Sequence, residues 1–128
     1  MNRQVTSKVL QGLVVHGEKL GRKIGFPTAN LSPIDPFESF PKGVYAVQVR
    51  RMERQYQGVM NIGTRPTVAQ DELTVEVHIL DFNTEIYGET LQIEIIQFIR
   101  HEQKFSGLPA LKQQIQKDVS KARECTHL

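Results

Sequence analysis

At 128 residues, with 39% hydrophobic and 23% charged side chains, the chain is long enough for one domain with its own hydrophobic core. Its formal net charge of +2 is too small for a general nucleic-acid binder, and its single cysteine, Cys125, excludes an intrachain disulfide and an all-cysteine zinc site. No apolar run approaches membrane-spanning length, and the polar segment Met1 to Lys8 lacks the apolar core of a signal peptide. We therefore expect a cytoplasmic protein with no membrane partner.

Most apolar runs have the character of short β-strands. In the fourth of them, valine and isoleucine alternate with polar residues, which is the period of a half-buried strand. In chain order the predicted strands are Val9–His16, Gly43–Arg51, Gln55–Ile62, Leu73–Leu80 and Thr90–Arg100. A further extended segment is expected after Pro27.

One helix is predicted near the C-terminus, at about residues 107–124. Ser106 can cap it and Pro109 fits its first turn. Apolar residues recur at helical spacing at Leu108, Leu111, Ile115, Val119 and Ala122.

Several short antiparallel strands followed by one helix predict a mainly β fold, in which the sheet closes into a barrel and the helix packs outside it. Closure is expected because it removes the exposed sheet edges that a small β domain must otherwise protect. We treat residues 1–128 as a single domain with a short polar arm at residues 1–8.

The stretch from Gly17 to Asn30 is the most informative part of the sequence. It contains three glycines (Gly17, Gly21, Gly25) and three cations (Lys19, Arg22, Lys23). Glycines allow the backbone to approach a bulky anion, and cations supply counter-charge. The spacing matches neither a P-loop nor a dinucleotide fingerprint, and a glycine-rich turn with solvated lysines is an equally good explanation of this part alone.

The end of the stretch favours a binding site. Pro27 fixes the backbone before Thr28 and Asn30, which lie about 7 Å apart on one face of an extended segment. Their hydroxyl and amide oxygens could hold a hard cation such as Mg²⁺, which prefers oxygen ligands and substrate phosphates. The stretch as a whole is therefore interpreted as a site for a metal–nucleotide.

Glu76 is a candidate general base, since a strand holds its carboxylate at a fixed position. His78 shares its face and is a possible partner. The alternative is that both residues lie on the solvent face of an amphipathic strand, as most glutamates do.

Two connecting segments are weaker candidates. Arg100 to Phe105 places charges around one aromatic ring, which suits either a substrate flap or a solvated junction. Asn61 to Thr67 is rich in hydrogen-bonding groups and is predicted to be a structural turn.

Five segments together resemble the riboflavin kinase (flavokinase) family, and in particular the kinase module of bacterial bifunctional FAD synthetases. The resemblance runs from about Gly12 to Arg123. The segments are GLVVHGEKLGRKIGFPTANL, KGVYAV, GVMNIGTRPTV, TVEVHILDFNTEIYGE and RHEQKFSGLPALKQQIQKDVSKA.

The resemblance implies a six-stranded antiparallel Greek-key barrel with a C-terminal helix. It implies transfer of the ATP γ-phosphate to the 5′-hydroxyl of riboflavin, with FMN and ADP as products and Mg²⁺ as cofactor. It assigns the metal to Thr28 and Asn30 and the base to Glu76. The nucleotide phosphates are assigned to Gly17, Lys19, Gly21, Arg22 and Gly25, and the flavin side to Arg100, Glu102 and Phe105.

The adenylyltransferase half of bifunctional FAD synthetases is not recognised in this chain, so we expect FMN and not FAD as its product. The chain is expected to be a stand-alone kinase or a module of a longer protein. Two other functions stay open from the sequence: a non-catalytic flavin- or nucleotide-binding module, and an RNA-binding barrel that uses the basic loop. The small net charge and the scarcity of aromatic residues on the predicted strands disfavour the latter, and we expect no nucleic-acid partner.

Overall fold

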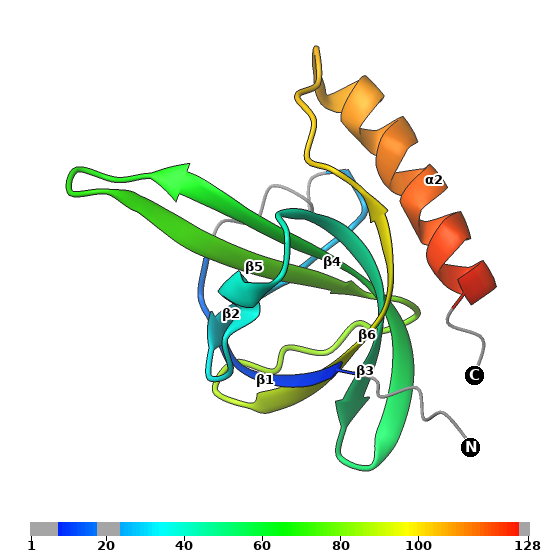
Figure 1. Cartoon of the computed structure of the whole chain (residues 1–128). Coiled ribbons are helices and arrows are strands. Elements are labelled where there is room, and N and C mark those ends of the chain that lie inside the picture. Colours follow the sequence, from blue (N-terminus) through cyan, green and yellow to red (C-terminus); the bar gives the residue numbers. More distant parts are fainter. Residues whose placement is uncertain (1–7, 18–23, 126–128) are drawn as a thin grey trace, which may run out of the picture.

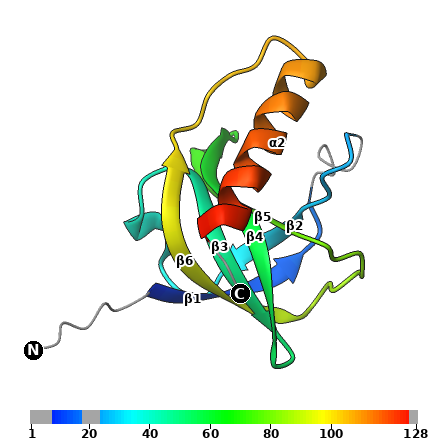
Figure 2. The same cartoon turned by 90° about the vertical axis from the view of Figure 1, so that its right-hand side faces the viewer.

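Six antiparallel strands close into a barrel, and one helix packs against its outer surface (Figures 1 and 2). The structure is a computed structural model that describes residues 8–17 and 24–125. Its elements are β1 (Lys8–Val15), β2 (Ala29–Pro33), the short 3₁₀ helix η1 (Phe37–Ser39), β3 (Gly43–Arg51), β4 (Arg54–Pro66), β5 (Asp71–Ile79), β6 (Thr90–Arg100) and α2 (Leu108–Cys125). The predicted fold class, a mainly β closed barrel with an external C-terminal helix, is confirmed.

The order of strands around the barrel is β1-β2-β5-β4-β3-β6, and β6 pairs with β1 to close it. β2 thus keeps its chain neighbour β1 on one side, but its other neighbour is β5 rather than β3. This pairing sets the segment that follows Pro27 directly beside the strand that carries Glu76.

The barrel interior is filled by the inward-facing residues of every strand. The alternation predicted for β5 is observed: Val75, Val77 and Ile79 are buried in the core, while Glu76 and His78 lie on the outer face. Because side chains alternate along a strand, the apolar residues that fill the core also fix which polar residues face outward.

A second, smaller cluster joins the helix to the barrel. Ala122 of α2 packs on Val44, Ala46 and Val59, which face outward from β3 and β4. The helix occupies nearly the predicted range, but Leu108 is exposed, and Gly107 rather than Ser106 precedes the first helical residue. No helix within residues 8–17 and 24–125 is long and apolar enough to cross a membrane.

The prediction that Asn61 to Thr67 forms a turn is wrong. β4 continues to Pro66, and its pairs with β5 run on to Pro66 and Asp71. Ile62 is still buried in the core, whereas the part of the hairpin from Thr64 onward is exposed and projects beyond the barrel (Figure 1). That exposed part packs on no core, so its sequence has no alternating pattern. Pairing with β5 maintains the strand, and it places Asn61 opposite Glu76. The polar arm predicted over residues 1–8 ends before Lys8, because Lys8 already belongs to β1.

Candidate active site

Three polar side chains form a row across the outer face of three adjacent strands. Asn30 of β2 is in register with Glu76 of β5, which is in register with Asn61 of β4. Thr28 lies just before β2, and its hydroxyl donates a hydrogen bond of 3.1 Å to Glu76 Oε1 across 48 residues of sequence. The structure therefore brings together the two predicted metal ligands and the predicted base.

A backbone contact fixes the segment before Thr28. His78 Nδ1 lies 2.7 Å from the carbonyl oxygen of Pro27, and because a carbonyl only accepts, Nδ1 carries the proton. The His78 ring also meets the Phe26 ring edge-to-face at 5.4 Å. The contact from His78 thus holds the Pro27 carbonyl against β5, on the face that His78 shares with Glu76, the predicted base.

Of the glycines predicted to bind phosphate, the structure describes Gly17 and Gly25. Gly17 packs so closely on Asn30 that a Cβ there would lie 2.6 Å from both Oδ1 and Nδ2 of the amide. Gly25 has φ of +89°, a conformation that side chains disfavour. Lys19, Gly21 and Arg22 lie outside the described residues.

A cavity of about 330 Å³ lies between the outer face of the barrel and the helix, and we call it the helix-side cavity. Its walls come from β4 and β5, from α2, and from the segment that joins β6 to α2. The lining residues include Thr28, Asn61, Glu76, His78, Arg100, Glu102, Phe105 and Asp118. It is lined by apolar as well as polar residues, as sites for amphipathic small molecules are.

A second cavity of about 430 Å³ lies on the other side of the Pro27–Ala29 backbone, and we call it the loop-side cavity. The segment Phe82 to Tyr87 forms one wall, and Val14, Val77 and Ile79 form its apolar floor. Thr28 lines both cavities. The residue whose hydroxyl is bonded to Glu76 therefore belongs to the walls of both cavities.

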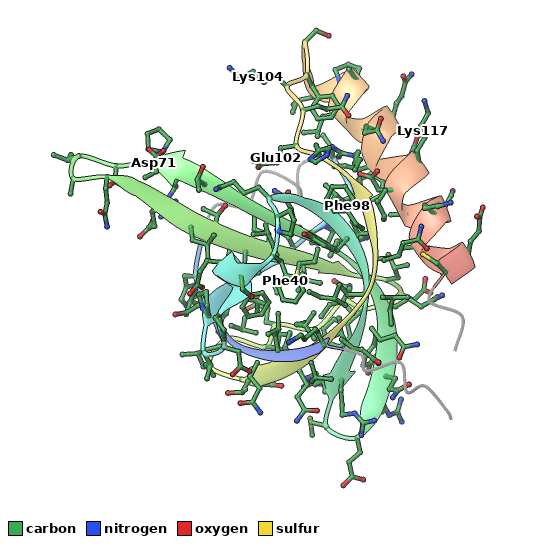
Figure 3. The ribbon with its side chains drawn as sticks, viewed as in Figure 1. Phe40, Asp71, Phe98, Glu102, Lys104 and Lys117 are labelled. Carbon is green, nitrogen blue, oxygen red and sulfur yellow. The ribbon has the colours of Figure 1, made fainter. Side chains whose placement is uncertain are left out.

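The predicted flavin-side residues divide into two kinds. Arg100 is held by Asp118 of α2, with Nε and Nη2 at 3.0 and 2.8 Å from its two carboxylate oxygens, and lies over the Phe105 ring. Glu102 reaches back onto β4, where its carboxylate occupies the space that a side chain at position 63 would need. In Figure 3 Glu102 and Lys104 lie on the segment between β6 and α2, whereas Lys117 lies on the side of α2 that faces away from the barrel.

Sequence reasoning missed several residues of the site. Asn61 was assigned to a turn, although it also lay at the end of the predicted strand Gln55–Ile62, and nothing in its local sequence places it beside Glu76. Asp118 did carry a signal, because it is a carboxylate within the apolar stripe of the helix, between Ile115 and Ala122. Asp118 is only 2% exposed, and an aspartate is rarely buried to this extent unless another group pairs with its charge, as Arg100 does here.

The fold and the site define a class: a closed antiparallel barrel with two cavities that have Thr28 in common, and with the Asn30 amide and the Glu76 carboxylate next to that threonine in the strand register. Residues 6–126 match the family model Flavokinase, described as riboflavin kinase, and the chain belongs to the riboflavin kinase family. The predicted resemblance is thus confirmed.

Individual relatives agree with the family. The bifunctional riboflavin kinase/FMN adenylyltransferase of Escherichia coli K12 is 50% identical over 116 residues, which cover 90% of this chain and 37% of that protein. The chain thus spans little more than a third of that relative. The crystal structure of riboflavin kinase from Trypanosoma brucei covers 91% of this chain and 77% of that one, with TM-score 0.65 and 29% identity. The crystal structure of a macrolide-efflux protein from Streptococcus pneumoniae has TM-score 0.84 and 37% identity, and covers 90% of this chain and 38% of that one.

Proposed function

We propose that this domain is a riboflavin kinase that transfers the γ-phosphate of ATP to the 5′-hydroxyl of riboflavin. The observation that carries the proposal is the position of Thr28, bonded to Glu76 and lining both cavities. Two substrates that exchange a phosphoryl group must meet at one point, and Thr28 lines both ligand spaces beside a carboxylate. The proposed activity covers the kinase step alone, since the family match accounts for nearly all of the sequence. We expect it to act in the cytoplasm.

ATP is assigned to the loop-side cavity. In the sequence the glycine-rich stretch joins β1, which carries the lining residue Val14, to the lining residues Pro27, Thr28 and Ala29, and we assign its backbone N–H groups and its cations Lys19 and Arg22 to the phosphates. The apolar floor at Val14, Val77 and Ile79 suits the flat face of a purine.

Riboflavin is assigned to the helix-side cavity. An aromatic ring system with a polyhydroxylated tail needs an apolar wall at one end and hydrogen-bonding groups at the other. Phe105, Leu111 and Ile115 supply the first, and Asn61 and Glu76 the second. The ribityl hydroxyl would then point toward Thr28 and the donor.

The residues present fit a magnesium ion. Thr28 and Asn30 offer neutral oxygens on one outward face, and the close approach of Gly17 restricts where the Asn30 amide can lie. Oxygen-only donors that leave room for phosphate oxygens are the kind of site that Mg²⁺ occupies. When bound, the ion would neutralise charge on the phosphates.

Glu76 is the proposed base. In the reaction the riboflavin hydroxyl oxygen forms a bond to the γ-phosphorus, the bond from that phosphorus to the β-phosphate bridging oxygen breaks, and ADP leaves. The hydroxyl proton passes to Glu76. Phosphoryl transfer depends chiefly on positioning and charge neutralisation. The hydrogen bond from Thr28 therefore contributes to the reaction by orienting the Glu76 carboxylate toward the hydroxyl.

Incubation of the protein with riboflavin, ATP and Mg²⁺, followed by chromatography of the flavins and nucleotides, tests the proposal. We expect FMN and ADP in equal amounts and no FAD. Binding of both ligands without FMN, under varied metals and with reduced flavin, would favour the non-catalytic binding module instead. Failure to bind either ligand would contradict both functions.

A glycine substitution tests the metal–nucleotide assignment through the backbone. In Gly17→Ala the new methyl group must displace the Asn30 amide, which is the end of a side chain and moves at little cost to the fold. We expect the affinity for Mg²⁺–ADP by calorimetry to fall at least about fivefold, with little change in Tm. Gly107→Ala is the control, because a Cβ there meets only Pro109 Cδ at an ordinary 3.7 Å. Equal affinities in the two variants would contradict the assignment.

A further inference from the structure

Two matching clusters stand beside the two cavities, and neither is needed for the chemistry at Thr28. Each consists of an arginine, a carboxylate that the arginine binds with two nitrogens, and a phenylalanine ring under the guanidinium. We call them the helix-side clamp (Arg100, Asp118 and Phe105) and the loop-side clamp (Arg51, Glu89 and Phe82).

The helix-side clamp holds the segment that walls the helix-side cavity. Arg100 Nη1 donates to the carbonyl oxygen of His101 at 3.2 Å, at the start of that segment, and its guanidinium lies 5.7 Å from the centre of the Phe105 ring, near its end. Asp118 then fixes the guanidinium to α2. Gln114 Nε2 donates a further bond of 3.0 Å to Asp118, so this buried carboxylate is fully engaged.

The loop-side clamp holds the segment that walls the loop-side cavity in the same manner. The Arg51 guanidinium lies 5.5 Å from the centre of the Phe82 ring at the start of the segment, and Arg51 Nε donates to Glu89 Oε1 at 2.8 Å at its end. The Phe82 ring also packs edge-to-face on Tyr56. The hydrogen bond from Arg51 lowers the pKa of Glu89 below its ordinary value, so the pair is fully ionised near neutral pH.

A bidentate guanidinium–carboxylate pair fixes direction as well as distance, which a lysine or a single hydrogen bond does not. In each clamp one guanidinium touches both ends of a connecting segment, and so the shape of that cavity wall depends on it.

We infer that the two clamps are positioning devices of separate specificity: the helix-side clamp sets the affinity for riboflavin, and the loop-side clamp sets the affinity for ATP. The inference rests on the proposed function for its substrates. Asp118 and Glu89 are thus positioning residues that act through the arginine and the phenylalanine that they hold.

The test measures the KM for riboflavin and the KM for ATP in each of two variants, Asp118→Asn and Glu89→Gln. We expect Asp118→Asn to raise the KM for riboflavin about fivefold and to leave that for ATP unchanged, and Glu89→Gln to do the reverse. In both variants kcat should change little, because neither residue touches the reacting atoms. Glu72→Gln is the matched control, since it breaks an exposed arginine–carboxylate pair on the β4–β5 hairpin, away from both cavities.

Two further measurements separate positioning from stability. Asp118→Glu and Glu89→Asp retain a carboxylate for the arginine, so they should restore part of the KM change that the corresponding amide variant causes, which a loss of stability alone would not predict. In the ligand-free protein, amide hydrogen exchange should rise at residues 101–105 in Asp118→Asn and at residues 82–89 in Glu89→Gln.

The outcomes distinguish the two proposals. Wild-type protein that makes no FMN would overturn the proposed function, and the substrate roles of the clamps with it. If wild-type protein makes FMN and each variant shifts both KM values equally or neither, the clamp inference alone is overturned. The same holds if hydrogen exchange rises over the whole barrel.

Discussion

Replacing Glu76 with glutamine is expected to lower the turnover of riboflavin phosphorylation at least about tenfold, the low end for a general base in a reaction that depends mainly on positioning. The amide can still accept the hydrogen bond from the Thr28 hydroxyl, so the local structure should persist. It cannot take up the proton of the ribityl hydroxyl. The KM for ATP should stay near its wild-type value, since the base faces the acceptor. Steady-state kinetics with riboflavin and ATP measure both quantities.

Glu72→Gln supplies the control for this prediction. Glu72 lies on the same outward face of β5, four residues from Glu76, and undergoes the same chemical change outside both cavities. Its exposed pair with Arg65 contributes little to stability. If Glu76→Gln and Glu72→Gln retain the same turnover as the wild type, Glu76 has no part in the proton transfer.

Removing the side-chain oxygen of Asn30 is expected to abolish most of the increase in ADP affinity that Mg²⁺ causes. In wild-type protein, ADP should bind more tightly with Mg²⁺ than with a chelator. In Asn30→Ala, and likewise in Thr28→Ala, the affinity for Mg²⁺–ADP should fall about tenfold, while the affinity for metal-free ADP changes little. Calorimetric titrations with and without Mg²⁺ give this difference directly, without any turnover.

Ser32→Ala is the matched control for the metal prediction, because Ser32 is the next residue on the same face of β2 and is exposed. It should leave both ADP affinities at wild-type values. A loss of affinity in Asn30→Ala that is equal with and without Mg²⁺ would show that Asn30 contacts the nucleotide and not the metal.

Much of the barrel was predictable because its strands obey a local rule. The order of residue types along β5 is enough to assign Val75, Val77 and Ile79 to the core and Glu76 to the outer face. The end of β4, from Thr64 to Pro66, escaped prediction for the opposite reason. It is exposed and extends beyond the core, and only its pairing with β5 identifies it as a strand.

The site residues also divide into those that local sequence predicts and those that only tertiary contacts reveal. Thr28, Asn30 and Glu76 could be proposed from the spacing of residue types and from the family resemblance. Arg100 could be located near the flavin side, but its attachment to Asp118 depends on how α2 lies against the end of β6, which no local pattern encodes. The same applies to the pair between Arg51 and Glu89, whose members are 38 residues apart.

By itself, then, the sequence determined the class of fold, the glycine-rich stretch with its Thr28–Asn30 pair, and the outward position of Glu76. These depend on periodicity and on the chemistry of neighbouring residues, which act over a few positions of chain. The tertiary structure alone decided that β2 is inserted beside β5, that Thr28 bonds to Glu76 and lines both cavities, and that each cavity wall is held by its own arginine. Strand register and helix docking bring together residues 18 to 48 positions apart, and their energies come from packing of the whole barrel rather than from any one segment.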